Sequence, residues 1–303
     1  MMSKTATREA YGKALAGLIS KRKDIIVLDA DLSKSTKTSE AKAVCPNQHF
    51  NMGIAEANMM GVAAGLAASG KTVFASSFAM FAAGRAYEQI RNSIAYPKLN
   101  IKICATHAGL AVGEDGASHQ CIEDLALMRV IPNMVVIQPC DDIQTREVIE
   151  CIADYHGPCY VRLGRSAVED VYETTSHFQI GKGNILKKGN RIAVIASGAM
   201  VQEAIHATQD MDITLVDMPC IKPIDDKLIL ELAKTHEYII TCEEHNIIGG
   251  LGSAIAEVLA PCKLCKQIMI GVKDSFGESG KPAQLFEKYG IDAASIRNVI
   301  QSL

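Results

Sequence analysis

The sequence feature that most constrains the fold is a long stretch of small and apolar residues, 51–70, which reads NMGIAEANMMGVAAGLAASG. Glu56 is its only charged residue, and no other Asp, Glu, Lys or Arg lies between Lys42 and Lys71. A helix without a polar face is normally buried. We therefore expect a buried helix with one carboxylate near its N-terminus, where a buried charge needs a partner. Taken alone, Glu56 is more simply explained as an acidic residue that offsets the helix dipole.

A second stretch concentrates titratable side chains in a loop. Residues 106–120 read THAGLAVGEDGASHQ, in which Gly113 and Gly116 bracket an acidic pair and a histidine lies near each end. Glycines at these positions indicate a tight turn. Loops that carry such groups on a rigid scaffold usually belong to functional sites.

Strand and helix patterns alternate along the first part of the chain. Short apolar runs, which are typical of buried parallel strands, are followed by segments with helical periodicity. The expected strands are 24–29, 71–76, 100–105, 134–138 and 158–165, and the expected helices are 3–22, the segment that begins near Glu56, 78–93 and 144–155. This alternation predicts an α/β fold with a doubly wound parallel sheet.

The second part of the chain repeats the alternation. Strands are expected at 192–196, 213–217, 238–242 and 267–270, with helices between them. A length of 303 residues suits two α/β domains. We therefore expect a first domain at residues 1–170, a linker at 171–182 and a second domain at 183–303.

Composition excludes several classes of protein. Hydrophobic residues make up 48% and charged residues 21% of the chain, and the net charge is −3, which gives no support for nucleic-acid binding. No charge-free apolar run is long enough to cross a bilayer, and the N-terminus lacks the hydrophobic core of a signal peptide. We therefore expect a cytoplasmic protein without membrane partners.

The ten cysteines are scattered through apolar segments. Only Cys262 and Cys265 form a C-x-x-C pair, and no second pair completes a zinc site. We expect reduced, mostly buried thiols and no metal site on this chain.

The motif G-I-A-E-A-N at 53–58, together with the 106–120 loop, resembles the transketolase family of thiamine-diphosphate enzymes. Residues 277–280, GESG, also match a turn of that family's C-terminal domain. The resemblance covers nearly the whole chain but only the C-terminal half of a full-length transketolase, and the Gly-Asp-Gly motif of the N-terminal half is absent. It implies a pyrimidine-binding domain, a C-terminal domain and a split enzyme. The N-terminal partner subunit would hold the cofactor diphosphate and Mg²⁺ (or Ca²⁺), in a dimer of heterodimers.

The same resemblance implies roles for individual residues. Glu56 would be catalytic, hydrogen-bonding the pyrimidine N1′, while Phe78 and Phe81 match the aromatic pair beside the pyrimidine and Asp31 matches a position near the cofactor. The family often has a third aromatic residue where this chain has Gly84. The segment that begins at Arg85 instead resembles deoxyxylulose-phosphate synthases.

A further set of residues would bind a sugar phosphate. By resemblance, His107 and His119 would be catalytic and contact the donor and acceptor, and Asp115 would bind a ketose hydroxyl. The positions that match a phosphate site are Arg8, Ser35 and Arg165. Where the family often has Asp-Ser after the first histidine, this chain has Ala108-Gly109.

The expected activity is transfer of a two-carbon ketol unit from a ketose phosphate to an aldose phosphate, as in pentose-phosphate metabolism. Two other thiamine-diphosphate readings stay open: the beta subunit of a 2-oxoacid dehydrogenase, and half of a deoxyxylulose-phosphate synthase. A non-catalytic, transketolase-like protein is the alternative from another class.

Overall fold

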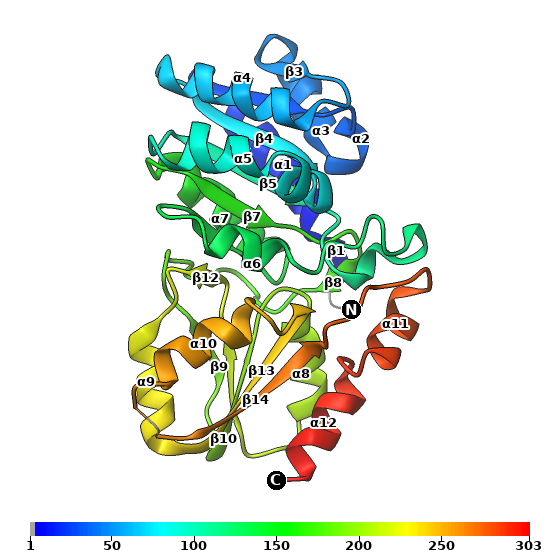
Figure 1. The fold of residues 1–303 in the computed structure, drawn as a ribbon, viewed down its shortest axis with the longest axis vertical. Helices are drawn as coiled ribbons and strands as arrows, with labels where there is room; N and C mark the ends of the chain where they lie inside the picture. Colours follow the sequence, from blue (N-terminus) through cyan, green and yellow to red (C-terminus); the bar gives the residue numbers. More distant parts are fainter. Residues whose placement is uncertain (1–3, 263) are drawn as a thin grey trace.

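The computed structural model describes residues 4–262 and 264–303, which build two large sheets stacked end to end, with helices packed on both faces of each, and one small two-stranded sheet (Figure 1). The larger sheet, at the top of Figure 1, comes mainly from the first half of the chain, and the smaller sheet from the second half. The predicted α/β fold with two doubly wound units is confirmed.

The larger sheet has seven strands, and six of them run parallel. In spatial order the seven strands are β12 (Cys220–Lys222), β6 (Val135–Ile137), β7 (Cys159–Arg162), β5 (Ile101–Thr106), β4 (Thr72–Phe78), β2 (Ile25–Asp29) and β3 (His49–Asn51). The antiparallel strand is β12. Every residue of β2, β4 and β5 is buried, which is the pattern of parallel strands covered on both faces.

Two sets of helices cover this sheet. One apolar cluster joins α1 (Thr7–Ile19), α3 (Thr38–Val44) and α7 (Asp142–Asp154) to one face. The other face carries α4 (Glu56–Ala68), α6 (Asp124–Arg129) and the segment of α5 (Tyr87–Gln89). Short turns complete this half: α2 (Ser33–Thr36) and the 3₁₀ turns η1 (Pro46–Gln48) and η4 (Leu110–Asp115).

The smaller sheet has five strands. Their order is β14 (Lys266–Val272), β13 (His236–Asn246), β10 (Arg191–Ala196), β11 (Thr214–Asp217) and β9 (Asn184–Lys187), with only β9 antiparallel. One face packs against α8 (Met200–Thr208), α11 (Pro282–Lys288) and α12 (Ala293–Gln301). The other face packs against α9 (Asp226–Thr235) and α10 (Leu251–Leu259), and its apolar cluster continues into the first half through Leu125 and Met128 of α6.

Two strand pairings join distant parts of the chain. The strand β12, which belongs to the second half, pairs antiparallel with β6 at the edge of the larger sheet. Near the N-terminus, β1 (Lys4–Ala6) pairs with β8 (Ala167–Glu169). The prediction of a helix over residues 3–22 is therefore wrong at its start, because the backbone of Lys4–Ala6 is used by this ladder and α1 begins at Thr7; residue 3 lies outside the described residues.

The segment predicted as a linker, 171–182, is held against the first half by two carboxylates, the buried Asp141 and the partly buried Glu147. Asp141, which caps α7 by accepting from Gln144 N at 2.7 Å, also accepts from Val171 N and Tyr172 N at 2.8 and 2.9 Å. Glu147 accepts from the backbone nitrogens of Ser176 and Phe178. These bonds satisfy the backbone of an irregular segment and fix its path.

The apolar helix α4 is covered on one side only. Met59, Met60 and Ala63 are buried in the core, whereas Asn58, Gly61, Gly65 and Ala68 are exposed in the single chain. The expectation of a helix buried all round is therefore wrong for this chain by itself. Small residues on the outer face leave no polar stripe, so the helix presents a smooth apolar surface.

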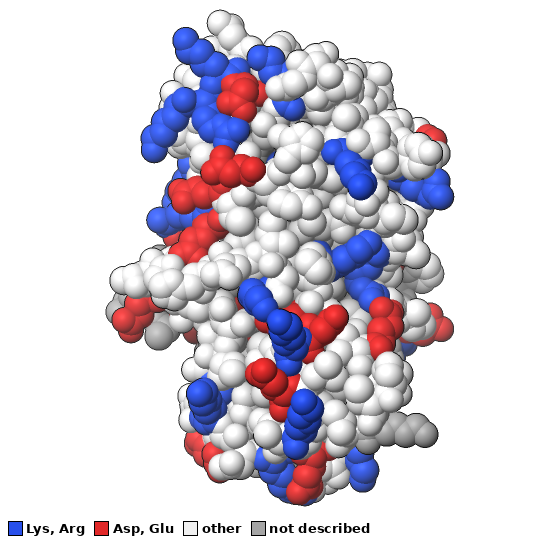
Figure 2. Space-filling view, turned by 90° about the vertical axis from the view of Figure 1, so that its left-hand side faces the viewer, with Lys and Arg blue, Asp and Glu red and all other residues white. Residues whose placement is uncertain are grey.

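All ten cysteines are free, and six of them are buried. Among the described residues, no helix combines the length and the apolar character needed to cross a membrane. The face in Figure 2 shows Lys and Arg side chains mixed with Asp and Glu, beside a broad uncharged area. No continuous patch of one sign covers that face.

Candidate active site

Most of the predicted site residues follow the carboxyl ends of neighbouring strands. Asp31 follows β2, Glu56 follows β3, Phe78 ends β4 and His107 follows β5. These strands are adjacent in the order β5-β4-β2-β3, so their carboxyl ends meet along one edge of the sheet. Ligands of open parallel sheets bind at such an edge.

Glu56 begins α4 and is 1% exposed. Its Oε2 accepts a hydrogen bond from Arg85 Nη1 at 2.7 Å, and in the described part of the chain no other group donates to Glu56. The partner that a buried carboxylate requires is therefore Arg85, which sequence analysis did not assign to the site. Arg85 also places its guanidinium carbon 4.8 Å from the centre of the Phe81 ring.

Arg85 reaches this position because the helix after β4 is irregular. Phe78 is still in the strand, and the chain then forms π-helical turns at Met80–Arg85 and Ile90–Ala95 on either side of α5. The predicted single helix over 78–93 is wrong in this respect. A π-turn has more residues per turn than an α-helix and is frequent at functional sites.

Four rings converge beside Glu56 and Arg85. Phe78 stacks on His107 with 3.8 Å between ring centroids, and its centroid is 6.0 Å from that of Phe81. His119 stands edge-on to Phe81 at 5.4 Å and to Phe78 at 6.3 Å. The structure therefore brings together both predicted histidines and both predicted phenylalanines.

His107 has a defined tautomer. Arg8 Nη1 lies 3.1 Å from His107 Nε2, and because a guanidinium only donates, Nε2 accepts. The proton is then on Nδ1, 2.9 Å from Thr106 Oγ1. Burial, followed by the positive charges of Arg8 and Arg165, lowers the pKa of His107 from 6.5 to about 3. The ring is therefore neutral near pH 7. The backbone at His107 has a positive φ of 56°.

The two arginines of the predicted phosphate site lie near one another. Arg8 donates to the backbone carbonyl of Ser35 at 2.9 Å, so Ser35 contacts it through the main chain rather than the hydroxyl. Arg165 donates to Val112 O and to Glu114 Oε2. Burial and the proximity of Arg165 both lower the pKa of Arg8, although neighbouring Glu9 opposes this shift.

Asp31 and Asp115 are less embedded. Asp31 has a positive φ of 64° and accepts from Asn51 Nδ2 at 3.2 Å, while Asn51 Oδ1 accepts from Asp31 N. Asp115 ends the turn η4 and is exposed, with no side-chain hydrogen bond to another site residue in the described chain. The structure places Asp31 at the strand edge but does not join Asp115 to the ring cluster.

The loop that carries the histidines is supported from the second half of the chain. Glu244, near the end of β13, accepts a hydrogen bond from Ala111 N at 2.6 Å. Gln120 Nε2 donates to Glu278 O at 2.9 Å across the same junction. Burial raises the pKa of Glu244 from 4.5 to about 7, against the lowering effects of Arg162 and the Ala111 amide. Sequence analysis assigned no role to Glu244.

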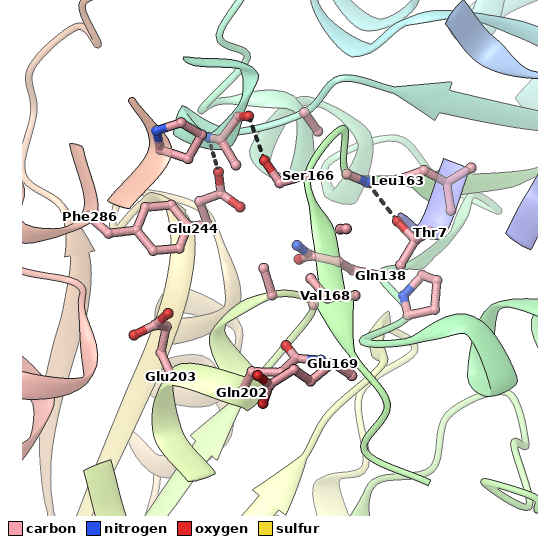
Figure 3. Close-up of a pocket in the computed structure, with 18 of the residues that line it drawn as sticks. Thr7, Gln138, Leu163, Ser166, Val168, Glu169, Gln202, Glu203, Glu244 and Phe286 are labelled. Atoms are coloured by element: carbon pink, nitrogen blue, oxygen red, sulfur yellow. Dashed lines mark hydrogen bonds between the residues drawn. The ribbon is translucent and has the colours of Figure 1, made fainter. Parts of the chain in front are cut away.

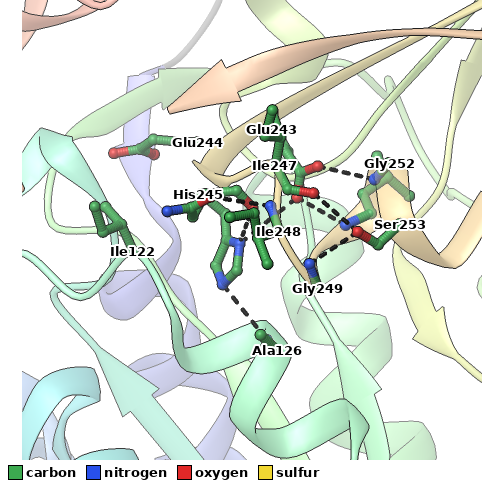
Figure 4. Close-up of polar contacts among 12 residues, drawn as sticks. Ile122, Ala126, Glu243, Glu244, His245, Ile247, Ile248, Gly249, Gly252 and Ser253 are labelled. Atoms are coloured by element: carbon green, nitrogen blue, oxygen red, sulfur yellow. Dashed lines mark hydrogen bonds and ion pairs between the residues drawn. The ribbon is translucent and has the colours of Figure 1, made fainter. Parts of the chain in front are cut away.

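Figure 4 shows how that segment is fixed at the junction. Glu243 accepts from Leu251 N and Gly252 N, at the start of α10, at 2.7 and 2.8 Å. His245 Nε2 accepts from Ala126 N at 3.4 Å on α6. Beside them, the fully buried Arg162 donates to Asp124 and to the carbonyl oxygens of Cys121 and Glu244. Elements of both halves are thus tied behind the histidine loop.

A cavity of about 220 Å³ lies on the other side of Glu244, between the two halves (Figure 3). Its walls include Thr7, Gln138, Ser166, Gln202 and Phe286. It is separate from the ring cluster, because none of Glu56, Phe78, Phe81 or His119 lines it. Among the described residues, no group of three or more His, Cys, Asp or Glu side chains is arranged to hold a metal ion.

Comparison with known families gives two matches along the chain. Residues 3–170 match the model "Transketolase, pyrimidine binding domain", and residues 181–296 match "Transketolase, C-terminal domain". The chain therefore belongs to the transketolase family, and it contains the pyrimidine-binding and C-terminal domains of that family.

Individual relatives narrow this assignment. The chain is 52% identical to a protein of Methanocaldococcus jannaschii named as a transketolase C-terminal section, over 95% of this chain and 93% of that one. A solved structure described as a split-gene transketolase, an inactive β4 tetramer, is 52% identical with a TM-score of 0.91, over 98% of this chain and 97% of that one. Within the family, the chain thus matches the C-terminal section of a split transketolase.

More distant relatives differ in what their names state. A 6-deoxy-6-sulfo-D-fructose transketolase subunit from a Clostridium species is 35% identical over 95% of this chain and 91% of that one. Human transketolase is 36% identical over 99% of this chain, which spans 49% of the human protein.

Proposed function

We propose that this chain is the C-terminal subunit of a thiamine-diphosphate-dependent transketolase, which transfers a two-carbon ketol unit between sugar phosphates in the cytoplasm. It would be active only with an N-terminal partner subunit, in a dimer of heterodimers. The observation that carries the proposal is the buried Glu56 beside the ring cluster of Phe78, Phe81, His107 and His119. A purely structural helix start requires neither the carboxylate nor the histidines beside it.

The residues present fit the pyrimidine half of the cofactor. An aminopyrimidine is a flat ring with hydrogen-bonding nitrogens on its edge, and it matches a buried carboxylate next to an aromatic face. Glu56 is 1% exposed and Phe81 is half-buried beside it. When bound, thiamine diphosphate supplies the nucleophilic carbon that carries the two-carbon unit. We assign the diphosphate and its Mg²⁺ (or Ca²⁺) to the partner subunit, because the Gly-Asp-Gly motif is absent from this sequence.

Glu56 would hold the proton at the pyrimidine N1′. A glutamate held within hydrogen-bond reach of a ring nitrogen can take up and return its proton as a general acid and base. Phe78 and Phe81 would orient the ring, and Asp31 would contact the cofactor from the end of β2.

The sugar would lie along His107 and His119, with Asp115 at a hydroxyl. The pKa of His107, lowered to about 3, keeps its imidazole neutral near pH 7, so it can hydrogen-bond hydroxyl groups without acquiring charge. Arg8 and Arg165, with Ser35, would bind the terminal anionic group, since guanidinium groups match tetrahedral oxyanions. The relative named for 6-deoxy-6-sulfo-D-fructose favours the same chemistry with a sulfonate in place of the phosphate.

The test is reconstitution with the N-terminal transketolase subunit from the same genome. Ketol transfer from xylulose 5-phosphate to ribose 5-phosphate is measured with thiamine diphosphate and Mg²⁺, for each chain alone and for the mixture. We expect activity only in the mixture. Glu56→Ala should lose most turnover, while Glu88→Gln, an exposed acid on α5, should retain it.

Two results would contradict the proposal. Near-normal activity of Glu56→Ala would remove Glu56 from the reaction. Release of CO₂ from a 2-oxoacid without ketose transfer would instead favour the dehydrogenase or deoxyxylulose-phosphate synthase reading.

A further inference from the structure

A single side chain, Arg85, contacts both groups that the proposed pyrimidine site offers. Its Nη1 donates to Glu56 Oε2 at 2.7 Å, and its guanidinium carbon lies 4.8 Å from the centre of the Phe81 ring. Glu56 is the proposed hydrogen-bond acceptor of the site, and Phe81 provides the proposed stacking surface.

We propose that Arg85 is an internal substitute for the aminopyrimidine ring, which occupies the site in the unliganded chain and must leave when a ligand binds. The inference deepens the proposed function and rests on it. It adds a residue that sets the affinity of this subunit for its cofactor.

The chemistry of the two groups is alike. A guanidinium is planar, carries N–H donors on its edge and stacks on aromatic faces. An aminopyrimidine is also planar and presents nitrogen groups on one edge. One carboxylate oxygen and one ring face cannot serve both at once, so Arg85 and the ligand compete.

The local structure allows Arg85 to enter and leave. Its side chain is 49% exposed, whereas that of Glu56 is 1% exposed, so the arginine reaches inward from the surface. In the described part of the chain, Arg85 donates to no group other than Glu56. About half of the guanidinium side chain is already in water, so the main cost of its departure is the loss of the charge-assisted hydrogen bond to Glu56.

The π-turn Met80–Arg85 fixes the starting position of this side chain. Gly84 contributes to the same geometry, because a Cβ there would lie 2.7 Å from Met80 Cε. Arg91, one π-turn further on, is exposed and donates to Asn92 Oδ1. It therefore offers a matched control that carries the same charge on the same segment.

The experiment measures thiamine binding to the full chain without its partner, by isothermal titration calorimetry. Arg85→Met is expected to bind thiamine about tenfold more tightly than the wild type, because loss of a charge-assisted competitor is at least that large an effect. Arg91→Met should bind as the wild type does. The double variant Glu56→Gln/Arg85→Met should not show this gain in thiamine affinity, because it lacks the Glu56 carboxylate that accepts the hydrogen bond.

Arg85→Lys is the second variant, used if Arg85→Met fails to fold with Glu56 unpaired. Lysine retains the charge but not the flat donor edge, so it should also bind thiamine more tightly than the wild type. Equal or weaker thiamine binding by a folded Arg85 variant would overturn the proposal.

The ketol-transfer function and the role of Arg85 can be contradicted independently of each other. If the wild-type mixture catalyses ketol transfer and no Arg85 variant gains affinity, the substitution by Arg85 is wrong and the reaction stands. If an Arg85 variant gains Glu56-dependent affinity while no mixture transfers a ketol unit, the role of Arg85 stands and the reaction is wrong.

Discussion

Gly109 and the carboxylate of Glu244 are in such close contact that a Cβ on Gly109 would lie 2.3 Å from Glu244 Oε1. Gly109 belongs to the histidine loop and Glu244 to the other half of the chain. The backbone of Gly109 also has a φ of +81°, a conformation that residues with a side chain rarely adopt.

Replacement of Gly109 by Ala should therefore be strongly destabilising. Positive φ alone costs about 1–2 kcal/mol, and displacement of a buried carboxylate adds to it. We expect the free energy of unfolding, measured in urea, to fall by about 3 kcal/mol or more. Gly70→Ala is the matched control, because Gly70 has a φ of +88° with nothing within 4 Å of its Cβ position. Equal losses of unfolding free energy in the two variants would show that the contact with Glu244 adds nothing to the cost of the positive φ.

Glu244 should make stability depend on pH. Because its pKa is raised from 4.5 to about 7, the native chain retains a proton that the unfolded chain loses within that interval. Stability from this group is therefore complete below pH 4.5 and is lost as the pH rises through about 7.

Glu244→Gln cannot ionise but keeps an oxygen for the Ala111 amide. In the wild type, Glu244 should lower the free energy of unfolding by up to about 1.4 kcal/mol for each unit by which the pH rises. We expect Glu244→Gln to lack this decrease when urea unfolding is compared at about pH 5 and about pH 7. Glu257→Gln, at an exposed ion pair with Arg129, should leave the wild-type pH dependence intact. An unchanged pH dependence in Glu244→Gln would show that the group titrates alike in both states.

Arg8 should hold the pKa of His107 down. Burial is the main cause of that low pKa, and the charge of Arg8 is the next. Arg8→Met should raise the pKa of His107 by about one unit, because one nearby cation is removed while burial persists.

The measurement is an NMR titration of the histidine Cε1–H signals, with His107→Asn used to assign the resonance. Arg22→Met removes an arginine that pairs with Asp24 and Asp154, and it should leave the titration of His107 unchanged. A pKa of His107 that does not move in Arg8→Met would remove Arg8 as a cause.

Asp141 should matter more than an ordinary helix cap. Asp141→Ala removes the cap of α7 and the acceptor of Val171 N and Tyr172 N, so we expect a loss of about 2–4 kcal/mol in urea unfolding. Faster amide hydrogen exchange at 171 and 172 should accompany it. Asp292→Ala, which removes only the cap of α12, should cost about 1 kcal/mol. Equal losses would contradict the role of Asp141 in fixing the segment.

Continuous apolar runs made the central strands predictable from the sequence, and β2, β4 and β5 lie where they were expected. Three-residue strands such as β1 and β12 carry no periodic signal, because their pairing depends on residues far away in the chain. The π-turns were missed because their apolar pattern over a few residues resembles that of an α-helix.

For the site, motifs indicated the residues on the strand ends but not what contacts them. The need of Glu56 for a partner was predictable, but Lys71, Arg85 and Arg91 all follow it in the sequence and only the fold selects Arg85. Nothing local indicates that Glu244 reaches Ala111, since the two residues are 133 positions apart.

The pairing of β12 with β6 has a consequence for anyone who expresses the chain in pieces. A fragment that stops before Cys220 leaves the backbone of Val135–Ile137 without its outer neighbour. An unpaired strand at a sheet edge recruits other chains and promotes aggregation. Soluble production of the pyrimidine-binding half would therefore require a grafted substitute strand or a blocking charge on β6.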